Sequence, residues 1–167
     1  MKKELYNIIV LKLRIIVGWW MNNQSRQALW LALAGSIVLM IGMGYGRFAF
    51  TGVLPLMLNE GLLTLHEGNL AASANYAGYL VGALLLARVQ PGAATRLSII
   101  SAGLTIASLA LLAWVSSPWT IITLRAVAGA LSAITLIAGS LWLLEHMGHH
   151  HGAPLLYAGV GLGIFIS

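Results

Sequence analysis

The sequence predicts an all-α, polytopic membrane protein with about five transmembrane helices. Of its 167 residues, 59% are hydrophobic and only 8% are charged, whereas an average soluble domain contains about 25% charged residues. The apolar runs are roughly 17–27 residues long, which suits helices that cross a bilayer rather than the roughly ten-residue alternating strands of a membrane barrel. The net charge of +5 then reflects orientation in a membrane, and we expect no nucleic-acid partner.

The chain divides into an N-terminal segment, residues 1–20, and a membrane domain, residues 21–167. The apolar run Asn7–Trp20 is short for a membrane span and contains two central basic residues. The first segment is therefore either a basic interfacial helix or an extension upstream of a natural start at Met21. In the membrane domain, apolar runs separated by turn residues predict helices at about residues 27–54, 69–87, 97–115, 119–144 and 153–167.

The positive charges predict how these helices are oriented. Basic residues precede the first helix, and Arg88 and Arg96 lie in the connection between the second and third helices, which Pro91 and Gly92 mark as a turn. The turn at residues 59–68 and the connection before the fourth helix contain no Lys or Arg. Because cytoplasmic loops carry an excess of Lys and Arg, we expect a multi-pass protein of the cell inner (plasma) membrane with a cytoplasmic N-terminus.

Two arginines within apolar helices, Arg47 and Arg125, are candidate substrate-binding residues. A guanidinium near the middle of a membrane helix costs roughly 2.5–3.5 kcal/mol, so it normally faces a cavity or a partner. The first and fourth predicted helices run in opposite directions, which puts both arginines at a similar depth in the outer half of the membrane. No Asp or Glu lies within a predicted span. The arginines therefore cap carbonyls or reach the interface, or line a cavity for anions, or pair with carboxylates in another part of the protein.

The second predicted helix adds two substrate-binding candidates, Asn75 and Tyr79. They are four residues apart and so share one helix face, where they either line a pore or hydrogen-bond to another helix. Glycines predict close helix packing, because they let a second helix approach the backbone. On this basis we expect helix contacts at Gly42, Gly44, Gly46, Gly78, Gly82, Gly129, Gly159 and Gly163.

The sequence contains no arrangement typical of an enzyme or a cofactor site. It has no cysteine, no nucleophile paired with a base and no glycine-rich phosphate loop. His146 and the run His149–His151 invite a metal interpretation, because imidazoles bind zinc, nickel or copper. A glycine-flanked loop with only Glu145 as a nearby carboxylate has no fixed geometry, so we expect a solvated loop and no metal.

Three motifs carry a resemblance to a known family. The stretch Gly44–Met57 resembles the first helix of the YbfB/YjiJ-type transporters, a group of the major facilitator superfamily. Arg125–Gly129 is similar to that superfamily's fourth-helix pattern of an arginine followed four residues later by glycine, and Tyr157–Ser167 is similar to the group's glycine-rich fifth helix. The resemblance covers essentially Met21–Ser167. The segment Gly82–Arg96 departs from the superfamily's loop signature because it has no Asp.

The resemblance implies a fold of two six-helix halves, of which this chain supplies five helices as a truncated N-terminal half. It further implies a secondary transporter for a small solute. Because the two arginines have no carboxylate partner within the predicted spans, we expect this solute to be anionic. Such a chain needs the missing C-terminal helices or another membrane subunit, besides the lipid bilayer, and should be inactive alone. The alternative is a small non-transporting subunit for assembly or regulation that packs through its glycine ridges.

Overall fold

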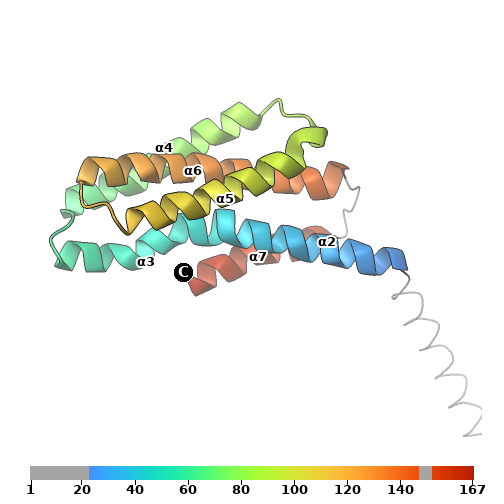
Figure 1. The fold of residues 1–167 in the computed structure, drawn as a ribbon, viewed down its shortest axis with the longest axis horizontal. Coiled ribbons are helices and arrows are strands. Elements are labelled where there is room, and N and C mark those ends of the chain that lie inside the picture. Colours follow the sequence, from blue (N-terminus) through green and yellow to red (C-terminus); the bar gives the residue numbers. More distant parts are fainter. Residues whose placement is uncertain (1–22, 147–151) are drawn as a thin grey trace, which may run out of the picture.

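The computed structural model of the chain describes residues 23–146 and 152–167, and every regular element within them is helical (Figure 1). The elements in chain order are α2 (Asn23–Leu39), the π-helix η1 (Met40–Tyr45), α3 (Gly46–Asn59), α4 (Leu65–Leu86), the 3-10 helix η2 (Pro91–Ala93), α5 (Ala94–Leu112), α6 (Pro118–Leu141), the π-helix η3 (Trp142–His146) and α7 (Ala153–Ile166). The N-terminal segment expected at residues 1–20 and the run His149–His151 lie outside the described residues.

Most helices of the described part are long enough to cross a membrane. Leu29–Asn59, Ala94–Leu112 and Pro118–Glu145 are long and apolar enough to cross a bilayer, and Ala153–Ile166 is a shorter apolar helix. The remaining helix, α4, has 22 residues, and its uncharged part, residues 68–86, has a length of about 28 Å, close to the roughly 30 Å hydrocarbon core. The prediction of an all-α, polytopic membrane protein is confirmed.

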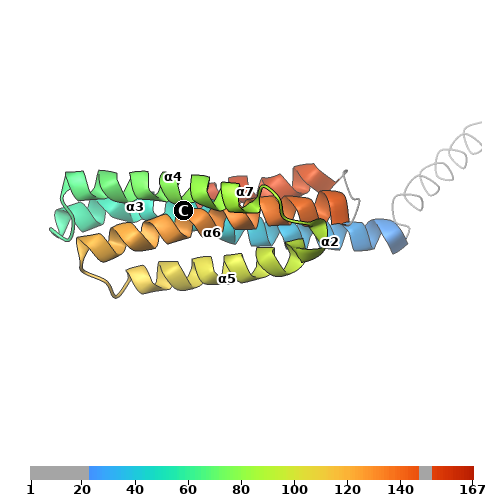
Figure 2. The ribbon, with the colours of Figure 1, turned by 90° about the horizontal axis from the view of Figure 1, so that it is seen from above.

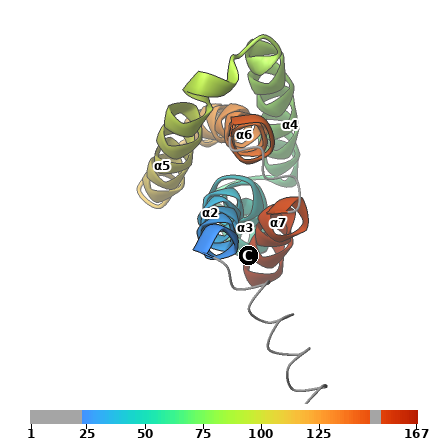
Figure 3. The same cartoon turned by 90° about the vertical axis from the view of Figure 1, so that its right-hand side faces the viewer.

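The helices run side by side along the long axis of the molecule (Figures 1 and 2). The end-on view in Figure 3 shows α6 between α4 and α5, with α2, α3 and α7 grouped beside them. Because α2, η1 and α3 follow one another without a break, the first span is a single helical stretch. Its middle is the π-helix, and this is the level at which α6 approaches it.

The first span is longer than the helix expected at residues 27–54, because it continues through Pro55 to Asn59. Proline has no N–H, so the carbonyl of Thr51 loses its helical donor, an interruption that membrane helices tolerate. The chain then reverses at Gly61, whose φ of 70° lies in the left-handed region. Glycine adopts this conformation at no steric cost.

A capping box starts α4 at Leu65, four residues before the expected start of this helix. The backbone N–H of Glu67 donates to the hydroxyl of Thr64 (3.3 Å), and the backbone N–H of Thr64 donates to the Glu67 carboxylate (2.8 Å). These two bonds satisfy donors that the helix itself cannot pair. The acidic turn between α3 and α4 thus has a defined conformation beside the first span.

Glycines bring α4 and α6 into backbone contact. A Cβ atom on Gly78 would overlap the carbonyl group of Ala126, and one on Gly82 would overlap that of Ala130. From the other helix, Gly129 approaches the backbone of α4 with equal closeness. Close approach of this kind maximises van der Waals contact between membrane helices, for which lipid provides no hydrophobic driving force.

A second close pair joins α7 to the first span. Gly159 approaches the carbonyl of Ser36, and Gly163 approaches both the carbonyl of Met40 and the Cα atom of Gly44. Added side chains at either glycine of α7 would collide with backbone atoms. The π-helix η1 is therefore held against α7 by glycines on both helices.

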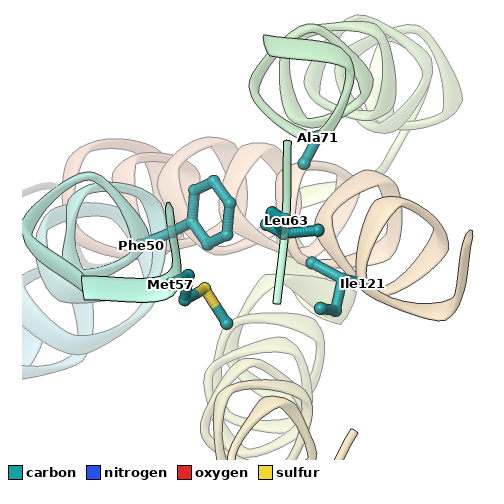
Figure 4. Close-up of a cluster of buried hydrophobic side chains, with 5 residues drawn as sticks. All are labelled: Phe50, Met57, Leu63, Ala71 and Ile121. Atoms are coloured by element: carbon teal, nitrogen blue, oxygen red, sulfur yellow. The ribbon is translucent and has the colours of Figure 1, made fainter. Parts of the chain in front are cut away.

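Two clusters of buried apolar side chains form the core of the bundle. The first consists of Phe50, Met57, Leu63, Ala71 and Ile121, whose side chains converge from α3, the following turn, α4 and α6 (Figure 4). The second consists of Ala32, Leu39, Leu143 and Leu156, from α2, η3 and α7. Along the first span, Arg47 comes after Leu39 of the second cluster and before Phe50 of the first.

Candidate functional site

Arg125 of α6 is buried, and its guanidinium donates hydrogen bonds to the backbone of the first span. Only 3% of its surface is exposed. Its Nη2 atom donates to the carbonyl oxygen of Arg47 (3.0 Å), and Nη1 donates to that of Gly46 (3.4 Å). Its Cζ atom lies 4.5 Å from the centroid of the Phe50 ring. The guanidinium thus ties α6 to the point where η1 passes into α3.

Asn75 of α4 hydrogen-bonds to the backbone of α6 at Arg125. The side chain is 1% exposed, and its Nδ2 atom donates to the carbonyl oxygen of Arg125 (3.0 Å). Because Arg125 in turn donates to the backbone at Arg47, a chain of hydrogen bonds crosses from α4 through α6 to α3. All three helices are therefore held in register at the level of the two arginines.

Arg47 is half-buried on α3 and faces aromatic rings of α4. Its Cζ atom lies 4.7 Å from the centroid of Tyr76 and 4.8 Å from that of Tyr79. The ring of Phe48 is 5.8 Å away. Its Nε atom is buried and has no hydrogen-bond partner within the described residues. The charge is thus surrounded by aromatic faces rather than by carboxylates.

The structure brings all four substrate-binding candidates to one level of the bundle, but they face different neighbours. Asn75 points to α6, whereas Tyr79 covers Arg47, although the two residues are four apart on α4. Tyr76 also covers Arg47 and was not among the candidates. Its position three residues before Tyr79 is the signal that could have identified it, because residues at this spacing are neighbours on a helix.

A row of buried hydroxyl groups on α5 also escaped the sequence analysis. Their spacing of three or four residues within an apolar helix is the signal for a face that contacts protein rather than lipid; they are Ser98, Ser101, Thr105 and Ser108. Ser101 pairs with Thr135 of α6 (2.8 Å). The side chains of Thr135 and Thr105 fill the space beside Gly42 and Gly46, respectively.

The cavities between the first span and α5 are not lined by the arginines. Two adjoining cavities, of about 520 and 430 Å³, share Tyr45 and Leu109 and lie between the first span and α5. The first also reaches Gly163 of α7, and the second reaches Glu60 in the turn between α3 and α4. Neither cavity is lined by Arg47 or Arg125. They form an apolar groove beside the site rather than the site itself.

The described residues contain no group of three or more His, Asp or Glu that could hold a metal ion. What the arrangement can do chemically is bind charge. The Nη1 and Nη2 atoms of Arg125 are directed at backbone carbonyls, whereas the Cζ atom of Arg47 lies beside aromatic rings. The buried Nε atoms of both arginines have no hydrogen-bond partner within the described residues. A guanidinium binds a carboxylate through its in-plane N–H groups.

A comparison with known families identifies the family of the chain. The model of the family described as "Uncharacterised MFS-type transporter YbfB" matches residues 39–167, well over half of the chain. No curated protein and no solved structure matches the chain. The resemblance found in the sequence motifs is confirmed, and the matched residues include both arginines. The chain therefore belongs to the YbfB-type family of the major facilitator superfamily, whose general activity is transmembrane transport.

Proposed function

We propose that the chain forms part of a secondary transporter for a small solute that carries a carboxylate, and that Arg47 binds this carboxylate. One observation carries the proposal. A half-buried guanidinium lies within a 31-residue apolar span, and no Asp or Glu occurs in the described residues 29–59, 94–112 or 118–144.

The energetics favour an anion from outside as the counter-charge. Placing an arginine at the centre of a membrane helix costs roughly 2.5–3.5 kcal/mol. Each contact with an aromatic face returns about 0.5–2 kcal/mol, depending on how dry the site is. Aromatic contacts offset this cost without neutralising the charge. A carboxylate that binds two of the in-plane donors of Arg47 adds charge-assisted hydrogen bonds that are roughly twice as strong as neutral ones.

Arg125 and Asn75 have a supporting part in this proposal. Nδ2 of Asn75 and both Nη atoms of Arg125 donate to carbonyl groups of neighbouring helices, so we assign these two residues to holding the backbone of Arg47 in place. Tyr79 contacts the guanidinium of Arg47 directly and belongs to the binding site. The two arginines thus have different roles, because the side chain of Arg125 contacts backbone and that of Arg47 contacts aromatic rings.

The proposed membrane is the inner membrane, with the N-terminus in the cytoplasm. Arg88 and Arg96 lie near the connection between α4 and α5, whereas the turns at residues 60–64 and 113–117 have no Lys or Arg. The positive-inside rule then places the α4–α5 connection in the cytoplasm. In this orientation Arg47 lies in the outer half of the membrane.

We further propose that the chain by itself binds the solute without transporting it. Alternating access requires two bodies that rock around a central site, and the described helices form one bundle. The apolar groove beside Tyr45 and Leu109 supports a role for further transmembrane helices, supplied by another segment or subunit.

The test is solute binding by the purified chain in lipid nanodiscs, with propionate, propionamide and propylammonium as matched probes. We expect saturable binding of propionate only, a loss of at least tenfold in affinity in Arg47→Ala, and a smaller loss in Arg47→Lys, because lysine keeps the charge but not the fork. Arg88→Ala is the control, since this exposed arginine is remote from the site. Equal propionate affinity in Arg47→Ala and the wild type would refute the role of Arg47.

A second measurement tests transport. Proteoliposomes that contain only this chain should show no uptake of labelled propionate above that of empty liposomes. Uptake that depends on the wild-type chain would contradict the requirement for further helices.

A further inference from the structure

Three aromatic rings from two helices lie next to the guanidinium of Arg47. Tyr76 and Tyr79 lie one turn apart on α4, and their ring centroids are 4.7 and 4.8 Å from Cζ of Arg47. Phe48, the next residue on α3, contributes a ring at 5.8 Å. All three distances fall within the roughly 6 Å over which a cation is attracted to the face of an aromatic ring.

The surroundings of this cluster favour a positive charge. The described membrane spans supply no carboxylate to Arg47, so the ring faces are the negative partners of its charge. The buried Nε atom has no hydrogen-bond partner within the described residues. Tyr76 is 59% exposed, which leaves the cluster open on one side. Aromatic rings around an open site are the typical recognition element for quaternary ammonium groups.

We infer that Tyr76, Tyr79 and Phe48 form an aromatic cation cage, and that the side chain of Arg47 fills this cage from within. The cage attracts a cation through ring faces and leaves the in-plane N–H groups of the guanidinium available to other partners. The tethered side chain competes with any free cation at an effective concentration in the millimolar range or above. A cation from solution is therefore excluded as long as Arg47 occupies the cage.

The neighbouring charge does not prevent a cation from binding here. Arg125 directs its donors at the carbonyls of Gly46 and Arg47 and lies over the ring of Phe50. The cage already holds one positive charge beside Arg125. Replacing the guanidinium by a free quaternary ammonium ion therefore preserves the charge at this point of the bundle.

The consequence is an inversion of charge selectivity when Arg47 is removed. With tetramethylammonium as the probe, the purified full chain in nanodiscs should show no saturable binding, whereas Arg47→Ala should bind the probe saturably. Adding Tyr76→Phe or Tyr79→Phe should retain this binding, because the ring face remains. Adding Tyr76→Leu or Tyr79→Leu should weaken it by about twofold to thirtyfold. Tyr45→Leu, which alters a ring that lines the apolar groove, is the matched control and should leave it unchanged.

Two outcomes of the binding experiment overturn the inference. The first is that a folded Arg47→Ala chain does not bind tetramethylammonium. The second is that its binding is unaffected by both leucine substitutions. Neither outcome depends on the carboxylate proposal, because that proposal is tested with propionate on the wild-type chain, and the two can fail separately.

A measurement on the unmodified site covers the case in which Arg47→Ala does not fold. In the nuclear magnetic resonance spectrum of the wild-type chain, the side-chain protons of Arg47 should be shifted upfield by the rings, relative to those of exposed Arg88. Tyr76→Phe and Tyr79→Phe should keep this shift, and the corresponding leucine variants should reduce it. Resonances of Arg47 that coincide with those of Arg88 would overturn the cage.

Discussion

Nη2 of Arg125 lies 3.0 Å from the carbonyl oxygen of Arg47, so the two arginines of the apolar spans meet although 78 residues separate them in the chain. The side chain of Arg125 contacts the backbone of Arg47, whereas the guanidinium of Arg47 contacts the aromatic rings of α4. The two arginines therefore have different surroundings, and their substitution should have different effects.

Arg125→Ala should lower the stability of the bundle. The substitution removes two hydrogen bonds to the first span and empties the space over Phe50. Charged hydrogen bonds contribute about 1.5–3 kcal/mol in soluble proteins, and polar contacts between membrane helices average about 0.6 kcal/mol. We expect a loss of about 1–3 kcal/mol, measured by reversible unfolding in mixed micelles. Wild-type stability combined with lost propionate binding would instead make Arg125 a solute ligand.

Gly78→Ala should separate α4 from α6. The added Cβ atom would overlap the carbonyl of Ala126, a backbone group that cannot move aside. Overpacking of this kind costs typically about 1–3 kcal/mol, which should appear as a lower midpoint of thermal unfolding in detergent. Gly103→Ala is the matched control, because a Cβ atom there meets no atom within 4 Å. If both variants unfold at the wild-type temperature, the close contact of these helices is wrong.

The orientation of the chain can be tested with single cysteines, since the sequence contains none. In whole cells, an impermeant thiol reagent should label Asn59→Cys at the outer turn and should not label Gln90→Cys in the α4–α5 connection. Both positions are exposed, whereas Leu63 in the same outer turn is only 3% exposed and would be a poor reporter. The reverse labelling pattern would contradict the proposed orientation.

Glu67→Gln should reduce stability in a manner that depends on pH. Hydrogen bonds from the backbone and side chain of Thr64 lower the pKa of Glu67 below its ordinary value of 4.5. A carboxyl group with a lowered pKa stabilises the folded state fully above its unfolded pKa and loses this contribution as the pH falls through its folded pKa. The difference in unfolding temperature between wild type and Glu67→Gln should therefore be present at neutral pH and shrink below about pH 4.5.

The same capping box bears on proton coupling. The described residues 29–59, 68–86, 94–112 and 118–144 contain no Asp or Glu, and arginine stays protonated at physiological pH. Glu67, ionised in its hydrogen-bonded state, is poorly suited to carry a proton near neutral pH. Among the described residues beside the site, Glu60 at the mouth of the apolar groove remains as the carboxylate to test. Uptake by the complete transporter that keeps its pH dependence in Glu60→Gln would exclude it.

The sequence by itself determined the class of the protein. The apolar runs and the scarcity of charge required membrane helices, because a bilayer leaves only internally hydrogen-bonded structures stable. Local motifs in the first, fourth and fifth helices were enough to identify the family, and the match over residues 39–167 confirms it. Arg47 and Arg125 stood out because a charge in an apolar helix is costly wherever the helix packs.

Only the tertiary structure decided what each polar side chain contacts. Asn75 and Tyr79 share a helix face by spacing, yet one donates to α6 and the other covers Arg47. The difference depends on how close α6 lies to α4, which is set by Gly78, Gly82 and Gly129 on two helices that are distant in sequence. Helical periodicity specifies directions around one axis, but the partner in each direction follows from the packing of several helices at once.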